Sequence, residues 1–264
     1  MNDIKQTLGV IIPAHNEATH IAKCLESLLS QIVPVEEIIV ICNSCTDGTE
    51  KIVKNYPSVK LIETEKKGLI NARNIGLETA KSEILARINA DVICADNWSQ
   101  ILMENFKKRD VEAVSGIAKT LTLPFWPRFY TAFWSSIYIY FAEAYLGIPV
   151  LWGANMAITK KAWNNIKKEA CTEDSEVHED QDLSIHLAAN SLKVIFDKKL
   201  IVTTSEKSYF TWGKFHYYNQ LRKITKKSHI KLINSHKVLK LSFIERSIRA
   251  SLILIPGSIF YITS

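Results

Sequence analysis

Strand-like and helix-like segments alternate along the first 120 residues, and this alternation restricts the fold more than any other feature of the sequence. The strand-like runs are almost continuously Ile, Val and Leu, as in strands buried on both faces, and the helix-like runs have apolar residues at helical spacing. Such alternation predicts an α/β fold with a mostly parallel central sheet and helices on both faces. We expect strands within TLGVIIP (7–13), EEIIVIC (36–42), VKLIE (59–63) and EILARIN (83–89), and helices within 17–31, 46–56 and 68–80.

Charge divides the chain into two parts. The 264 residues are 47% hydrophobic and 23% charged, which suffices for one large folded domain. Residues 206–249 contain eight Lys and three Arg against two acids, a net charge of +9 in a chain whose total is +6. We therefore predict an α/β domain over residues 1–205 and a basic, partly apolar helical extension over residues 206–264. A basic stretch favours phosphates or an anionic membrane surface, or simply forms a solvated helix face.

Polar residues follow three of the predicted strands, where a parallel sheet places its ligand crevice. The first strand is followed by His15, Asn16 and Glu17, the second by Asn43 to Asp47, and the fourth by Asn89 and Asp91. The sequence contains neither G-x-G-x-x-G after the first strand nor G-x-x-x-x-G-K-[ST] anywhere, which disfavours a Rossmann dinucleotide enzyme and a P-loop nucleotidase. Asp91 is predicted to lie at the mouth of this crevice.

Five ordered blocks between residues 9 and 190 carry a more specific signal. They are VIIPAHNEATHIAKCLESLLSQ, EIIVICNSCTDGT, KGLINARNIGLETAKSEILARINAD, WGANMAITKKAW and HEDQDLSIHL. Together they resemble the successive blocks of glycosyltransferase family 2. The resemblance implies a GT-A fold, a nucleotide-sugar donor, inverting transfer to a saccharide or lipid-linked acceptor, and a Mg²⁺ or Mn²⁺ cofactor.

The resemblance assigns Asp91 as the metal ligand, because a carboxylate-held cation stabilises the charge that develops on a nucleoside diphosphate leaving group. The family has Asp-x-Asp here, whereas this chain has Asn89 before Asp91, and Asn brings no charge to a metal site. Without the other blocks, both side chains would be read as turn caps. The residues implied to bind the donor nucleotide in the strand-end loops and the third helix are Pro13, His15, Glu17, Asn43, Arg73 and Asn89. Asp47 fits a ligand contact or an ordinary helix start.

The second acidic centre is HEDQDL. Inverting transfer needs a base for the acceptor proton, and Asp180 matches the Glu-Asp base of the family. Glu179 and Asp182 flank it, and neighbouring acids raise one another's proton affinity, although acids at a helix start also simply complement the helix dipole. Glu179 is also assigned to the donor site. Gly153 and Asn155 are expected to face the donor sugar, or else to belong to a strand entry.

The remaining features concern the cellular compartment of the protein and its contacts with a membrane or with nucleic acid. Five cysteines, an odd number, and the lack of an apolar leader before the first strand favour a reduced, cytoplasmic protein. The apolar segment 129–152 is expected to be a buried core helix or a helix across the acceptor side of the cleft. Residues 252–262, after the basic stretch, favour peripheral contact with the inner face of the cell membrane. Aromatic residues interleave with basic ones over 209–227, but no nucleic-acid fold accompanies them, so no nucleic-acid partner is expected.

Two other functions remain open. A sugar-nucleotide nucleotidyltransferase shares the cleft geometry, yet it would show a Gly-rich basic loop after the first strand, where this chain has PAHNEA. A catalytically degenerate nucleotide-sugar binding protein would fit Asn89, and it would also fit Cys42, which stands where many relatives have Asp.

Overall fold

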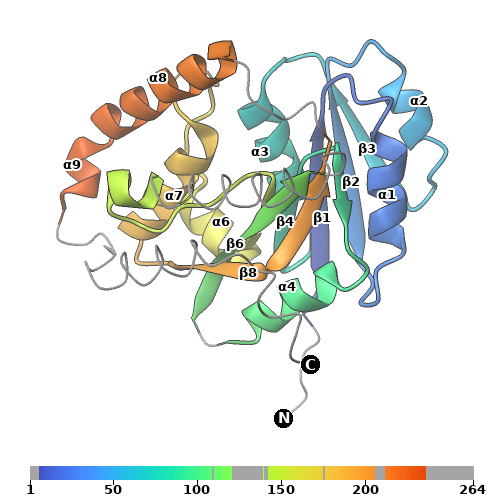
Figure 1. The fold of residues 1–264 in the computed structure, drawn as a ribbon, viewed down its shortest axis with the longest axis horizontal. Helices are drawn as coiled ribbons and strands as arrows, with labels where there is room; N and C mark the ends of the chain where they lie inside the picture. The colour runs from blue at the N-terminus through green and yellow to red at the C-terminus, as the bar shows by residue number, and fades with distance from the viewer. Residues whose placement is uncertain are drawn as a thin grey trace.

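The apolar runs of the sequence form the strands of one eight-stranded sheet in the computed structural model, with helices packed on both of its faces (Figure 1). The structure describes residues 6–108, 110–120, 139, 142–174, 176–205 and 212–235. The strand order is β3-β2-β1-β4-β7-β6-β8-β5. The strands are β1 (Leu8–Ala14), β2 (Glu37–Asn43), β3 (Val59–Thr64), β4 (Ile84–Ile88), β5 (Val92–Cys94), β6 (Val111–Thr120), β7 (Asn155–Thr159) and β8 (Lys193–Thr204).

The helices lie where the predicted pattern placed them in the first half of the chain. The three helices expected within 17–31, 46–56 and 68–80 are α1, α2 and α3, each shorter than its apolar pattern because the ends of the pattern are loop. The described helices are α1 (Ile21–Leu29), α2 (Thr49–Val53), α3 (Leu69–Thr79), α4 (Trp98–Phe106), α6 (Lys160–Ile166), α7 (Glu179–Ala189), α8 (Trp212–Ser228) and α9 (Ile230–Ile233).

Alternate residues of the central strands supply two separate hydrophobic cores, one on each face of the sheet. In β1, Val10 and Ile12 pack on one face together with α1 and α4, whereas Ile11 packs on the other face together with α3, α6 and α7. Every residue of β1 is buried. This explains why its sequence is continuously apolar instead of alternating, and it confirms the prediction of helices on both faces.

The sheet is entirely parallel among β1 to β4 and mixed beyond them. β1 pairs in parallel with β2 and β4, and β2 pairs in parallel with β3, as predicted. β7, in contrast, pairs antiparallel with both β4 and β6, and β5 pairs antiparallel with β8. β6 and β8 are parallel neighbours with two irregularities in register. The second half of the chain therefore adds strands to the sheet in both parallel and antiparallel pairings. No local pattern in the sequence predicts these pairings.

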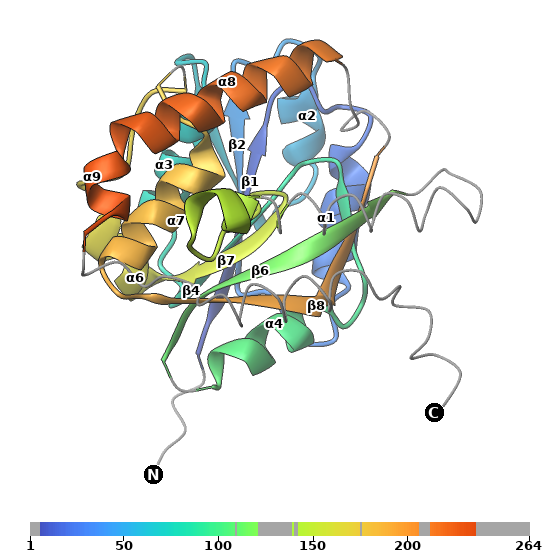
Figure 2. The same cartoon turned by 60° about the vertical axis from the view of Figure 1, so that its left-hand side comes forward.

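Helices α7, α8 and α9 form a layer outside the second core. Figures 1 and 2 both show α8 and α9 alongside α7, and Ile233 of α9 shares a small buried cluster with Ile185 and Ala188 of α7. This part of the predicted extension therefore packs on the α/β domain. Of the segment 129–152, residues 129–138, 140 and 141 lie outside the described residues, as do residues 236–264 with the predicted apolar C-terminal segment. Within the described part of the chain, no helix combines the length and apolar character needed to cross a bilayer.

Candidate functional site

Three loops at the carboxyl ends of β1, β2 and β4 form one edge of the sheet, as the parallel arrangement requires. Pro13 lies inside β1 and is buried; it has no N–H to donate, and the ladder between β1 and β4 covers only Leu8 to Ile11. His15 is exposed in the loop after β1, and its Nδ1 lies 2.6 Å from the backbone oxygen of Asn43 at the end of β2. The loops after β1 and β2 are therefore joined directly.

Side chains predicted to contact a nucleotide also hold these loops together. The side-chain amide of Asn43 donates to the Gly68 oxygen (2.8 Å) and accepts from the Gly68 N–H (3.2 Å), which ties β2 to the start of α3. Asp47 accepts from the backbone N–H groups of Ala18 and Thr49, which confirms that it holds the turn before α2. Glu17 is half-buried, with Oε2 3.2 Å from His20.

The N–H groups at the start of a helix such as α3 are unpaired and attract anions. The carboxylate of Asp174 occupies part of this position, with Oδ1 accepting from the Ile70 N–H at 2.8 Å. Arg73, one turn further along, is fully buried. Its guanidinium donates to Asn74 and lies 3.6 Å from the carboxylate of Glu179. In this structure Arg73 therefore faces the start of α7.

Asp91 follows β4 and is held by hydroxyl groups from the end of β8. Oδ2 of Asp91 accepts hydrogen bonds from Thr204 Oγ1 at 2.9 Å and from Ser205 Oγ at 2.8 Å. The Asp91 side chain is 8% exposed, and Asn89 before it is half-buried. The strand that carries these hydroxyls was not anticipated from the sequence, although a Thr-Thr-Ser run ending an apolar stretch is a signal for it.

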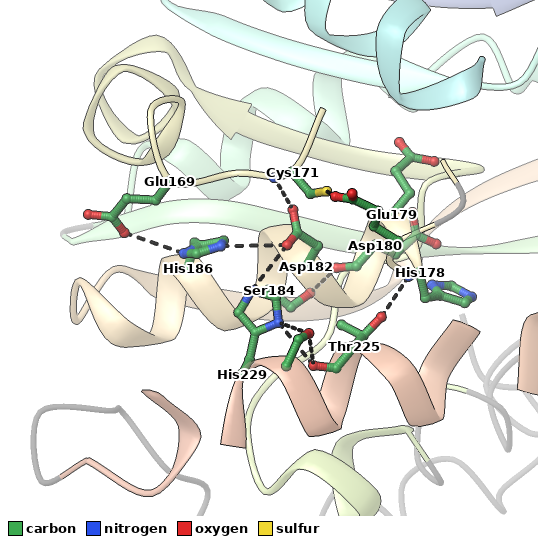
Figure 3. A network of polar contacts seen from close by, with 12 residues as sticks. Glu169, Cys171, His178, Glu179, Asp180, Asp182, Ser184, His186, Thr225 and His229 are labelled. Carbon is green, nitrogen blue, oxygen red and sulfur yellow. Dashed lines mark hydrogen bonds and ion pairs between the residues drawn. The ribbon is translucent and has the colours of Figure 1, made fainter. Parts of the chain in front are cut away.

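The first turn of α7 presents the second acidic centre. Glu179 lies between two buried arginines, with Arg87 Nη2 3.5 Å from its Oε2 and Arg73 on the other side. Asp180 is likewise buried, and its Oδ1 has no hydrogen-bond partner among the residues that the structure describes. Burial raises the pKa of the Asp180 carboxyl above its ordinary value, and the positive charge of Arg87 opposes that rise. Figure 3 shows Glu179 and Asp180 at the start of the helix.

Gly153 lies where β4 and the first turn of α7 come together. A Cβ at Gly153 would lie 2.1 Å from Arg87 Nη1 and 2.5 Å from Asp180 Oδ1, so only glycine lets these groups approach the backbone. Two residues later Asn155 begins β7, opposite Ile88 at the end of β4, and Asp91 follows three residues after Ile88. Asp180 therefore lies against the end of the strand pair that leads into Asp91.

Asn155 and Arg87 both bond within the fold. Asn155 is fully buried; its amide nitrogen donates to Ile117 and Leu200 oxygens, and its Oδ1 accepts from Trp98 Nε1. It begins β7, which is the strand entry that the sequence offered as the alternative to a donor-sugar contact. Arg87 was overlooked, although one charged residue inside an apolar strand signals a buried ion pair.

This chain is similar in sequence to several known proteins. The profile described as Glycosyl transferase family 2 matches residues 9–166. The glycosyltransferase AglE of Haloferax volcanii is 34% identical over 116 residues, which are 41% of this chain and 38% of AglE. The poly-beta-1,6-N-acetyl-D-glucosamine synthase of Staphylococcus epidermidis is 29% identical over 114 residues, 41% of this chain and 28% of the synthase. The matched regions thus span well under half of these relatives.

Solved structures share the fold at low sequence identity. The mannosyltransferase PcManGT from Pyrobaculum calidifontis, in complex with GDP-Man and Mn²⁺, has a TM-score of 0.64 at 18% identity, covering 99% of this chain and 77% of that protein. S. aureus TarS 1-349 in complex with UDP-GlcNAc has a TM-score of 0.63 at 16% identity, covering 96% and 73%. The predicted GT-A fold is confirmed. Because the family profile covers more than half of its length, this chain belongs to glycosyltransferase family 2.

Proposed function

We propose that this protein is an inverting glycosyltransferase that moves a sugar from a nucleoside-diphosphate sugar to an acceptor hydroxyl or lipid phosphate. Membership of glycosyltransferase family 2 supports the reaction class. The observation that carries the mechanism is the buried Asp180 carboxylate, whose Oδ1 lacks a hydrogen-bond partner in the described part of the chain. A buried acceptor atom without a partner is costly, which is expected where a substrate hydroxyl supplies the missing hydrogen bond.

In this mechanism Asp180 is the general base. It accepts the proton of the acceptor hydroxyl while the acceptor oxygen attacks the anomeric carbon opposite the leaving nucleoside diphosphate. Burial raises the pKa of Asp180, which makes the carboxylate a better base, and the positive charge of Arg87 opposes that rise. Where the acceptor is already a phosphate, Asp180 orients it instead. Glu179, held between Arg73 and Arg87, fixes the first turn of α7.

The proposal includes Mg²⁺ or Mn²⁺ bound through Asp91, and the residues present fit a hard cation. The Asp91 carboxylate is held in one orientation by Thr204 and Ser205, and Asn89 offers a carbonyl oxygen nearby in sequence. Carboxylate and carbonyl oxygens are the ligands that such cations prefer. When bound, the cation neutralises the negative charge that develops on the leaving diphosphate. The Mn²⁺ in PcManGT is consistent with this assignment.

Replacing Asp180 with Asn tests the base. We expect Asp180→Asn to bind donor nucleotide sugars with nearly wild-type affinity but to reduce transfer by at least about a hundredfold, since general base catalysis contributes about 10²–10⁴. The measurement pairs calorimetric donor binding with release of nucleoside diphosphate, using a panel of donors with saccharide and polyprenyl phosphate acceptors. The matched control is Asp197→Asn, an acid on β8 outside this site. Transfer by Asp180→Asn at the wild-type rate would remove Asp180 from the base role.

Chelation tests the cation separately. EDTA should abolish transfer by the wild-type protein, and Mn²⁺ or Mg²⁺ added in excess should restore it. Asp91→Asn should need far more cation for the same rate, because it loses the one charged ligand of the site. Turnover that is insensitive to EDTA would exclude the metal role of Asp91. Donor binding without any turnover across the panel would instead favour a nucleotide-sugar binding protein, the alternative to which Asn89 and Cys42 point.

A further inference from the structure

Three side chains outside the proposed transfer site converge at the junction of α7 with α9. Asp182 and His186 lie one turn apart on the same face of α7, and His229 immediately precedes α9. Asp182 Oδ1 lies 3.5 Å from His186 Nε2 and 3.4 Å from His229 Nε2, and all three atoms lie within 4.8 Å of one another. Figure 3 shows the two imidazoles directed at one carboxylate.

The other ring nitrogen of each histidine also lies near an oxygen acceptor. Nδ1 of His229 lies 2.9 Å from the backbone oxygen of Thr225 and 3.0 Å from the Ser228 hydroxyl. Nδ1 of His186 lies 3.3 Å from the carboxylate of Glu169 but makes no hydrogen bond among the described residues. Nε2 of each imidazole faces Asp182, and its lone pair, when unprotonated, can bind a cation there. This is the arrangement of metal-binding histidines, whose second nitrogen is held by a carboxylate or carbonyl.

Three electron-rich atoms thus meet in a space almost closed to water. The side chain of Asp182 is fully buried, and those of His186 and His229 are 6% and 16% exposed. Neither Oδ1 of Asp182 nor Nε2 of His186 has a hydrogen-bond partner among the described residues. The other carboxylate oxygen of Asp182 accepts from the Cys171 N–H at 2.9 Å, which fixes the orientation of the group. If both nitrogens are unprotonated, these atoms repel one another at this depth unless a cation lies between them.

We propose that Asp182, His186 and His229 bind a structural transition-metal ion, with Zn²⁺ as the cation that fits best. Zinc bonds of 2.0–2.2 Å at tetrahedral angles separate neighbouring ligand atoms by about 3.3 Å, close to the two separations measured from Asp182. Imidazole suits zinc, whereas Mg²⁺ and Mn²⁺ prefer oxygen, so this site differs in chemistry from the one at Asp91. A water reaching the more exposed His229 side completes the coordination. The ion holds α9, and with it the basic extension, against α7.

Zinc titration of the purified full chain, made without a histidine tag and stripped of metal, tests the site. In competition with a chromophoric chelator, we expect one tight equivalent of Zn²⁺ per chain and a higher melting temperature with zinc. His229→Gln should lose the equivalent and the thermal shift, and it should fold because its side chain is partly exposed. Glu169→Gln, which alters the carboxylate shared by His186 and Asn190 but no proposed ligand, should weaken zinc affinity about tenfold to a hundredfold.

Matched control variants show whether zinc binds at this site or at other side chains of the protein. His216→Gln, on the exposed face of α8, and Glu173→Gln, near Glu169 in sequence, should bind zinc as the wild type does. Asp91→Asn should also retain the equivalent. The proposal is overturned if the wild-type chain binds no zinc, which would leave a protonated histidine pair as the explanation, or if His229→Gln binds it unchanged. Loss of the equivalent in Asp91→Asn would overturn it too, by moving the ion to the other site.

Discussion

Arg87 is the one charged residue of β4, and it lies 97% buried beside Glu179 and Asp180. Replacing it with Met should destabilise the protein by on the order of 3 kcal/mol, because the buried Glu179 carboxylate then keeps only Arg73 as an ion-pair partner among the described residues. Urea unfolding followed by circular dichroism measures the change. The Arg87→Met and Glu179→Gln substitutions should be coupled, so that the double variant loses less stability than the sum of the single variants.

An exposed ion pair provides the comparison for Arg87. Lys54 and Glu63 lie 3.0 Å apart, but their side chains are 59% and 56% exposed, so water and salt screen their attraction. Lys54→Gln should leave the urea midpoint unchanged. Equal losses of stability in Lys54→Gln and Arg87→Met would show that burial of the arginine does not determine its contribution.

Single residues were the hardest features to predict. The sequence singled out Glu179 and Asp180 correctly as neighbours in a first helical turn, since acids there precede a helical pattern. It assigned Asn43 to a ligand contact and Asn155 to a ligand contact or a strand entry, and in the structure both amides hydrogen-bond to backbone groups from other elements. A sequence pattern gives the residue type and its local element, whereas these partners lie 25 and 38 positions away. Whether a polar side chain contacts a ligand or the fold depends on such distant contacts.

At the scale of elements, α3 packs against β1 and β2 through Gly76. A Cβ at this position would lie 2.3 Å from Ile11 Cγ2 and 2.9 Å from Ile41 Cδ1, both in buried strands. Alanine is the better helix former by about 1 kcal/mol, but overpacking a well-packed interface costs about 1–3 kcal/mol. Because Ile11 lies in a central strand that cannot move aside, Gly76→Ala should lower the melting temperature of the protein.

The Ile11→Ala background separates the clash from other effects of Gly76→Ala. Ile11→Ala alone should be destabilising because it leaves a cavity in the second core. Adding Gly76→Ala to Ile11→Ala should then lower the melting temperature much less than Gly76→Ala does in the wild type, because the atom nearest to the new Cβ is gone. Additive losses in the calorimetric melting temperatures would contradict close packing of α3 on β1 as the reason for this glycine.

The order of elements could be predicted for half of the chain, for a physical reason. From β1 to β4 each strand is followed by a helix or a short loop, and the pairings β1–β2 and β2–β3 join neighbours in sequence. Beyond β4 the pairings join distant segments, as between β6 and β8 or between β5 and β8. Nothing in a local pattern specifies register across such separations, so the mixed part of the sheet appeared only in three dimensions.

At the scale of the whole molecule, positive charge gathers at α8 and α9. Exposed residues recur there at helical spacing and mix basic with apolar side chains: Lys223, Ile224, Lys227, Ile230 and Lys231. Ile224 and Ile230 are 46% and 40% exposed among these lysines. Figure 1 shows α8 and α9 on the opposite side of the molecule from α2. The described part of the extension therefore has the composition of a surface that contacts anionic lipid.

Charge reversal on this surface tests the predicted membrane contact. The protein should cosediment with vesicles that contain anionic lipid, and less so as salt is raised, because each Lys near such a surface contributes about 1 kcal/mol. The double variant Lys223→Glu/Lys227→Glu should bind at least about tenfold more weakly. Lys51→Glu/Lys60→Glu makes the same change in net charge at exposed sites on α2 and β3, and it should bind as the wild type does. If both double variants lose binding equally, the attraction follows the total charge of the molecule and not the face formed by α8 and α9.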